Sequence, residues 1–218
     1  MAFLPITLGV GHSPDAEKGV ARDRNALKNQ TEKTLKRDDY VCRFCGFRSL
    51  HYQRVLSWPD AGDPPFATAC TFCEQCIALE RAGITGSGVL IWLPEIEQAE
   101  LNHIARAIYI ARTSKTDIAE SATQALDALT ARRAEAKKRL GSDDPLLLAT
   151  VMQEMMNRKE NAQAAPKLDG IRLLPPDRHI VRTKSGDINQ FAQIIKYWCS
   201  FEGPYAKLPV ESWKEPSS

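Results

Sequence analysis

The chain has 218 residues, of which 43% are apolar and 26% are charged, and its formal net charge is +2. This composition is typical of a folded protein with one large or two small domains, and it excludes a chain that is disordered throughout. The near-neutral charge provides no overall attraction to nucleic acid or to an acidic membrane, so no nucleic-acid partner is expected.

The first residues, "MAFLPITLGVGH", carry no basic leader, and Pro5 interrupts their short apolar run. They therefore do not look like a secretion signal. The most apolar later stretch, "GVLIWLP" at 88–94, is far shorter than the ~18 residues that span a bilayer. The sequence predicts a cytoplasmic protein that reaches a membrane only indirectly, through a partner.

The amino-terminal half is expected to hold short elements around irregular segments. Residues 1–25 are expected to be irregular, and residues 26–37 to form a short helix. The prolines and glycine of 58–65 predict a loop without regular structure. Residues 74–83 are expected to form a short helix that ends at Gly83, and 88–94 a buried strand.

The cysteines carry the strongest chemical signal. Five of the six lie within residues 42–76, as a C-x2-C pair and, after a gap of 24 residues, a C-x2-C-x2-C group: Cys42, Cys45, Cys70, Cys73 and Cys76. Two such pairs separated by roughly 15–25 residues are typical of zinc sites, because a tight turn lets both sulfurs of a pair face one ion. Gly46 suits the backbone bend that the first pair needs.

Two other interpretations explain part of this pattern. A thioredoxin-like redox pair accounts for one C-x2-C but not for two, and buried free thiols account for both without a metal. A reducing compartment makes disulfides rare, which favours metal. We therefore expect one structural Zn²⁺ held by four ligands, Cys42, Cys45, Cys70 and Cys73.

Four thiolates close a tetrahedral shell, whereas a catalytic zinc keeps an open position, so the site is interpreted as structural. Cys76 is a spare thiol that replaces Cys70 or Cys73 if the following helix begins later. Cys199 follows Trp198 on an apolar helix and is expected to be a core residue.

From Pro94 the pattern becomes helical. The first helix is expected to begin near Pro94 and to bury a face formed by Leu101, Ile104, Ile108 and Ala111. A second helix is predicted over 116–140, with a stripe of Ile118, Ala122, Ala125 and Leu129. A third, over 145–160, has Asp144 as its cap.

Two features of these helices admit a binding role and a plainer one. Cations end the second helix: Arg132, Arg133, Lys137, Lys138 and Arg139. They suit contact with nucleic acid or lipid, but solvated charges at a helix carboxyl end are the favoured interpretation. The third helix carries Met152, Met155 and Met156, which suit an adaptable binding surface, although core packing is favoured.

The remaining chain is expected to contain a connector at 161–170 and a short apolar segment, "IRLLPP". That segment is either a packing anchor or an edge that takes a partner peptide. A final helix is predicted with a stripe of Ile188, Phe191, Ile195 and Trp198, before a loose tail in which Trp213 packs. The isolated histidines form no H-E-x-x-H motif and are interpreted as non-catalytic: His12, His103 and His179.

"RDDYVCRFCGF" followed by "TACTFCEQC" resembles the zinc frame of HNH endonucleases, in which two cysteine knuckles brace a ββα-metal motif. The chemistry of that family is missing from the matching positions. Arg54 and Val55 stand about where that family has an Asp-His or His-His pair, and Glu74 follows Cys73 where an asparagine is expected. The resemblance implies the fold without an active nuclease, so the catalytic and cofactor-binding residues are predicted to be none.

A closer resemblance covers nearly the whole chain. The segments "KRDDYVCRFCGF", "TACTFCEQC", "GSGVLIWLPEIEQAELNHIARAIY" and "GIRLLPPDRH" together resemble the IcmJ/DotN family, subunits of the Dot/Icm type IVB secretion system. The resemblance implies a degenerate HNH-like, zinc-binding subunit of the coupling-protein complex. Its implied partners are the carboxy-terminal extension of the coupling ATPase and the other subunits of that complex, at the inner membrane.

The sequence thus predicts an α+β, mainly helical protein, with an HNH-like (ββα, treble-clef-type) zinc module packed against a helical part. The expected domains are 1–93 and 94–218, joined as one compact unit. The expected function is that of a non-catalytic zinc-stabilised subunit that docks the coupling ATPase tail for effector export. The alternatives are an HNH-class endonuclease or DNA-binding protein, and a zinc-bearing interaction domain of an unrelated pathway.

Overall fold

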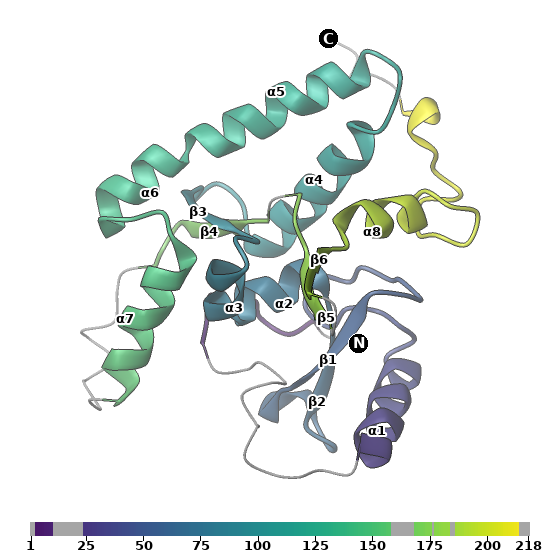
Figure 1. Cartoon of the computed structure of the whole chain (residues 1–218), viewed down its shortest axis with the longest axis vertical. Helices are drawn as coiled ribbons and strands as arrows, with labels where there is room; N and C mark the ends of the chain where they lie inside the picture. Colours follow the sequence, from purple (N-terminus) through teal and green to yellow (C-terminus); the bar gives the residue numbers. More distant parts are fainter. Residues whose placement is uncertain (1–2, 11–23, 158–167, 176, 184–185, 214–218) are drawn as a thin grey trace.

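The computed structural model describes residues 3–10, 24–157, 168–175, 177–183 and 186–213. Helices and small two-stranded sheets alternate along these residues, which agrees with the predicted α+β class (Figure 1). The helices are α1 (Arg24–Arg37), α2 (Thr71–Ile77), α3 (Leu79–Ile84), α4 (Gln98–Ala111), α5 (Ile118–Ala131), α6 (Arg133–Leu140), α7 (Pro145–Asn157) and α8 (Phe191–Trp198). The strands are β1 (Gln53–Ser57), β2 (Phe66–Cys70), β3 (Val89–Trp92), β4 (Ile171–Leu174), β5 (Ile180–Thr183) and β6 (Gly186–Asn189).

A β-hairpin and the helix that follows it form the centre of the cysteine-rich half. β1 and β2 are antiparallel, with Gln53 opposite Cys70 and Ser57 opposite Phe66. β2 ends at Cys70, and α2 begins at the next residue. Strand and helix therefore meet where the second cysteine group lies.

A second sheet joins segments that are far apart in the sequence. β3 pairs antiparallel with β4, so that Val89 faces Leu174 and Trp92 faces Ile171. Leu90, Ile91 and Leu173 are fully buried there. The segment "IRLLPP" is thus a packing anchor for β3 rather than a free edge.

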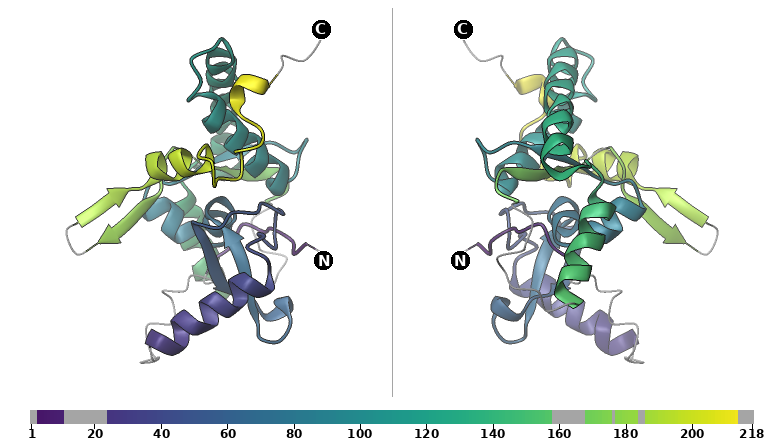
Figure 2. Two further views of the ribbon diagram at one scale, coloured as in Figure 1. Left: turned by 90° about the vertical axis from the view of Figure 1, so that its right-hand side faces the viewer. Right: turned by 90° about the vertical axis from the view of Figure 1, so that its left-hand side faces the viewer.

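The helices α4 to α7 surround the sheet of β3 and β4 (Figure 1). Helix α8 lies near α4, on the side of α4 that faces away from α6 and α7 (Figure 1). The hairpin of β5 and β6 projects away from the rest of the molecule in both side views (Figure 2). All four residues of β6 are exposed, which fits this projection.

The larger hydrophobic cluster draws residues from both predicted domains. Phe44, Leu56 and Phe72 pack in it together with Leu101 and Trp198. A smaller cluster gathers α3, α6, α7 and the second sheet around Cys76 and Leu79. The boundary at residue 93 stays a prediction, but the core is shared across it.

Several predicted helix limits were wrong. The helix expected at 74–83 is two helices that begin at Thr71 and Leu79, because Ala78 leaves the helical region at φ −118° and ψ 62°. The helix expected from Pro94 begins at Gln98, where Glu97 and Glu100 form a reciprocal capping box. The helix expected over 116–140 is divided at Arg132 into α5 and α6.

The predicted apolar stripes also needed correction. Ile104 is 42% exposed, since the buried face of α4 turns toward Asn102 and Arg106 instead. Ala125 is exposed, while its neighbour Leu126 packs against the core. Ile188 lies in β6 rather than in the last helix and is 41% exposed.

Smaller expectations had mixed outcomes. The loop at 58–65 contains a short 3-10 turn, Pro59–Ala61. Met152 packs in the smaller cluster, but Met156 is 62% exposed, so core packing holds for only part of the methionine stripe. The basic cluster at 132–139 is partly paired: Arg132 and Arg133, at the start of α6, pair with Glu95 and Asp143, and Arg139, in its last turn, pairs with Glu135. The expectations for residues 11–23, including His12, and for 161–167 lie outside the described residues.

Candidate metal centre

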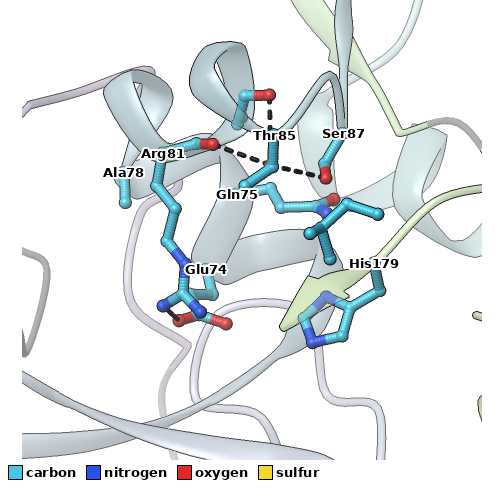
Figure 3. Close-up of a pocket in the computed structure, with 9 residues that line it drawn as sticks. Glu74, Gln75, Ala78, Arg81, Thr85, Ser87 and His179 are labelled. Carbon is cyan, nitrogen blue, oxygen red and sulfur yellow. Dashed lines mark hydrogen bonds and ion pairs between the residues drawn. The ribbon is translucent and has the colours of Figure 1, made fainter. Parts of the chain in front are cut away.

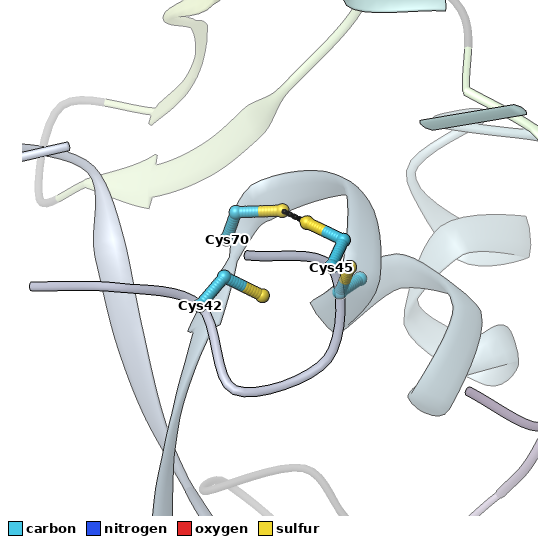
Figure 4. Close-up of side chains that lie close together, drawn as sticks. Cys42, Cys45 and Cys70 are labelled. Carbon is cyan, nitrogen blue, oxygen red and sulfur yellow. Dashed lines mark hydrogen bonds between the residues drawn. The ribbon is translucent and has the colours of Figure 1, made fainter. Parts of the chain in front are cut away.

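Four buried thiols converge at one point between the first knuckle and the β2–α2 junction. The Sγ atoms of Cys42, Cys45, Cys70 and Cys73 all lie within 4.8 Å of one another. Cys45 and Cys70 are 3.7 Å apart (Figure 4). Sulfurs bound to one tetrahedral Zn²⁺ at about 2.3 Å stand roughly 3.8 Å from each other, so the group is positioned to bind one metal ion.

Local backbone geometry brings the first two sulfurs together. The Gly46 amide donates to the Cys42 carbonyl at 2.9 Å, and the Cys42 amide donates to the Phe47 carbonyl at 2.9 Å. Gly46 has φ +77°, a left-handed conformation that favours glycine. The bend predicted from Gly46 is therefore present.

A buried carboxylate fastens the knuckle to the hairpin. Asp38 is 2% exposed and accepts a hydrogen bond from the Thr68 amide at 3.0 Å. It also pairs with Arg37 at 2.9 Å and with Arg43 at 3.6 Å. Sequence reasoning did not single out Asp38, because an acidic residue before a knuckle is normally exposed.

Close packing makes the thiols electrostatically interdependent. Burial raises the pKa of the Cys42 and Cys73 thiols well above the ordinary value. Hydrogen bonding from Cys42 lowers the pKa of the Cys45 thiol. For Cys70, burial is the largest single influence and raises the pKa, but hydrogen bonds with Cys42 and Cys73 act in the opposite direction, and the net pKa is lowered. A bound cation stabilises all four as thiolates, which is the condition for metal ligation.

Helix α4 supplies a second layer of polar groups around the sulfurs. Asn102 is fully buried, and its Nδ2 donates to Cys73 Sγ at 3.3 Å. Arg106 is also fully buried, and its Nη2 donates to Cys70 Sγ at 3.5 Å. Neither residue was predicted from the sequence, although two polar residues four apart on an apolar helix were a visible signal.

His103 supports this layer without joining the thiols. Its Nε2 lies 2.6 Å from the Cys45 carbonyl oxygen, and Arg106 Nη1 lies 3.1 Å from its Nδ1. Because arginine has only donors, Nδ1 accepts, and Nε2 carries the proton that is donated to the carbonyl.

The two remaining cysteines lie apart from the group. Cys76 is buried in the smaller cluster, and its thiol donates to the Phe72 carbonyl at 3.2 Å. Cys199 is exposed, so its prediction as a core residue was wrong. It follows Trp198, which is 1% exposed, and one residue of helix turns the side chain about 100° away from the core.

A small cavity lies at α2 and α3 beside the projecting hairpin (Figure 3). Its volume is about 10 Å³, which is space for about one water molecule. Glu74, 2% exposed, pairs there with Arg81 at 2.9 Å and with Arg54 at 3.7 Å. His179 lines the same cavity.

A larger open groove borders the first knuckle. Its volume is about 480 Å³, and its walls come from residues 46–50, His103, Tyr197 and residues 201–208. Exposed apolar side chains line it, with Phe201 at 96%, Leu208 at 61% and Leu50 at 45%. His51, the histidine nearest the first knuckle in sequence, packs on the Tyr197 ring at 4.8 Å.

Among the described helices, none combines the length and the apolar character needed to cross a membrane. No family model matches the chain. A search of curated proteins finds the Type 4 apparatus protein DotN of Legionella pneumophila, which is 35% identical over 160 residues. The matched region covers 68% of this chain and 73% of that protein.

This identity and coverage agree with the family that the cysteine knuckles and the segments around them resemble in sequence. The chain therefore belongs to the DotN (IcmJ) family.

Proposed function

We propose that this chain is a non-catalytic, zinc-stabilised subunit of the coupling-protein complex, in which it docks the carboxy-terminal tail of the coupling ATPase for effector export. The observation that carries the proposal is membership of the DotN family together with a four-thiol site that leaves no ligand position for substrate. The other partners are further subunits of the complex, and contact with the inner membrane is indirect.

The metal is one structural Zn²⁺, held by Cys42, Cys45, Cys70 and Cys73. Four sulfur donors in a tetrahedral arrangement are the donor set that zinc favours. The ion fastens the first knuckle to the β2–α2 junction, so its binding free energy contributes directly to folding.

The β1–β2 hairpin followed by α2 supports an HNH-like ββα arrangement. Glu74, at the position after Cys73, is engaged by Arg81 and Arg54. Because Glu74 is held in an ion pair, it supports a structural role for this ββα module rather than nuclease activity.

The groove lined by residues 46–50, Tyr197 and 201–208 is the proposed docking surface. Phe201 and Leu208 expose apolar surface there, beside the first cysteine knuckle. A knuckle held rigid by zinc reduces the conformational entropy that is lost when a peptide binds against it. An extended or helical apolar peptide of the ATPase tail fits such a surface.

The test titrates the zinc-loaded full chain with the ATPase tail as a purified peptide, followed by calorimetry. We expect a dissociation constant of about 1 μM or tighter, equivalent to about −8 kcal/mol. Phe201→Asp and Leu50→Asp should weaken binding, while Ile84→Asp, at an apolar residue that is 62% exposed and lies outside the groove, should leave it unchanged.

The titration tests the docking function and the position of the docking surface separately. A tail that does not bind the unaltered chain contradicts the docking function. A tail that binds the groove variants as tightly as the unaltered chain places the docking surface elsewhere.

A further inference from the structure

The guanidinium of Arg106 is fully buried directly behind the four-thiol group. Arginine keeps its charge at every accessible pH, and a buried charge without a counter-charge is strongly destabilising. Among the described residues, no carboxylate forms an ion pair with Arg106. Its guanidinium donates to Cys70 Sγ and His103 Nδ1 and also interacts with the Tyr205 side chain, while its Nε has no hydrogen-bond partner there.

Aromatic packing does not supply the missing negative charge. The Arg106 guanidinium carbon lies 3.8 Å from the centre of the Phe47 ring and 5.3 Å from that of Phe72. Such contacts stabilise a guanidinium far less than burial without a counter-charge destabilises it. The ring contacts hold the guanidinium in place and shield it from water.

The thiol group supplies that charge once it holds a metal. Four thiolates around a divalent ion carry a net charge of about −2, in a buried site without solvent to screen it. Arg106 Nη2 is directed at one of these sulfurs at 3.5 Å, and Asn102 Nδ2 reaches another at 3.3 Å.

We propose that Arg106 is the buried counter-charge of the metal centre, a positioning residue that acts through Cys70 and favours a fully thiolate-ligated divalent ion. This inference rests on the proposed zinc site, but not on the docking of the ATPase tail. It makes α4 part of the metal centre, although α4 contributes no ligand.

The experiment measures the Zn²⁺ affinity of the full chain by competition with a chromophoric chelator. Arg106→Met keeps the apolar stem and removes the charge, and should weaken affinity about 10- to 100-fold, the range for residues that support metal ligands. Arg106→Lys keeps the charge and should retain most of the affinity. Arg106→Gln keeps donors without charge and should lose affinity as Met does.

Arg172→Met is the matched control. Arg172 is also largely buried, with 12% side-chain exposure, and donates to the Ile96 carbonyl at 2.8 Å. Its loss should lower the stability of the fold while leaving the Zn²⁺ affinity unchanged, so it separates general destabilisation from an effect on the metal.

A spectrum of the Co²⁺-loaded chain gives a readout that packing alone does not move. Loss of the Arg106 hydrogen bond raises the energy of the sulfur lone pairs, so the sulfur-to-cobalt charge-transfer band of Arg106→Met should shift to longer wavelength. Arg172→Met should leave the band in place.

Unchanged Zn²⁺ affinity and an unchanged cobalt band in a folded Arg106→Met overturn the proposal and leave Arg106 a packing residue. If that variant does not fold, the comparison of Lys with Gln decides, because equal affinities in those two variants contradict a role for charge. A chain that binds no divalent metal overturns the proposal together with the zinc assignment.

Discussion

The buried carboxylate of Glu74 lies 2.9 Å from the guanidinium of Arg81. Arg54 approaches the other carboxylate oxygen at 3.7 Å, from β1. This ion pair joins α2, α3 and the hairpin immediately behind Cys73. The residue that follows Cys73 in the sequence thus makes a structural contact.

Glu74→Gln should destabilise the fold by about 1–3 kcal/mol, because it leaves two cations without their shared anion. The loss should stay below the ~3–5 kcal/mol of a fully buried pair, since the arginine side chains are 32% and 39% exposed. Urea unfolding of the zinc-loaded chain measures it. Glu80→Gln, an exposed acid on α3, is the control and should be neutral. Equal midpoints for both variants would contradict the structural role of Glu74.

Removal of the metal should unfold the cysteine-rich half. Structural zinc contributes roughly 10–16 kcal/mol to small modules, comparable to or larger than the ~5–15 kcal/mol stability of a whole domain. Cys42→Ser or a strong chelator should therefore abolish cooperative unfolding of that part, as followed by circular dichroism alongside metal analysis.

The remaining cysteines provide the controls for metal removal. Cys199→Ser changes an exposed side chain and should keep one zinc per chain. Cys76→Ala should also keep the zinc, because Cys76 lies outside the four-thiol group, even if it lowers stability. Loss of zinc from Cys76→Ala, or an unaltered fold in zinc-free protein, would contradict the assignment of the ligands.

The thiol group could be predicted from sequence because its determinants are local. The C-x2-C spacing and Gly46 fix how one pair of sulfurs points, and a second knuckle implies a shared ion. Arg106 and Asn102 could not be found in the same way. Their role depends on which face of α4 meets the cysteines, and the apolar residues alone assigned that face wrongly at Ile104.

Long-range pairing explains the other differences. β4 becomes a strand only by pairing with β3 across the helices α4 to α7, and no local pattern specifies that partner. The break between α2 and α3 at Ala78 could not be predicted from the sequence, because no proline or glycine marks it. Here the Leu79 amide donates to the Gly9 carbonyl at 3.0 Å, so a contact with the amino-terminal segment replaces a continuous helix.

His179 should make the fold sensitive to mild acid. Burial, with the charges of Arg54 and Arg81, lowers its pKa to about 4 from 6.5. The unfolded chain takes up this proton below pH 6.5 and the folded chain does not until about pH 4, so stability falls as the pH falls between these values. Between pH 7 and pH 5 the loss from this group is about 2 kcal/mol.

His179→Gln should remove that part of the pH dependence, measured as the difference in unfolding free energy from the unaltered chain at each pH under saturating zinc. The groups facing His179 are Arg54 and Arg81, with Glu74 in the same cavity. His51→Gln, at an exposed histidine, should keep the full dependence. A pH profile of His179→Gln parallel to that of the unaltered chain would contradict this account.

Gly83 permits the close approach of α3 to α7. A Cβ atom at this position would overlap the backbone of Leu146, in the first turn of α7, and backbone cannot move aside as a flexible side chain can. Gly83→Ala should therefore destabilise the chain by about 1–3 kcal/mol. The loss outweighs the ~1 kcal/mol that alanine otherwise gains over glycine in a helix.

Gly9→Ala is the matched control, because its Cβ would meet the Ile77 carbonyl oxygen at an ordinary 3.5 Å. Urea unfolding should separate the two variants, and amide exchange should show faster opening of α7 in Gly83→Ala alone. Neither α3 nor α7 contributes a cysteine to the four-thiol group, so the two variants should contain equal amounts of zinc. A Gly83→Ala variant as stable as Gly9→Ala would mean that α7 is not held against α3 as closely as the structure has it.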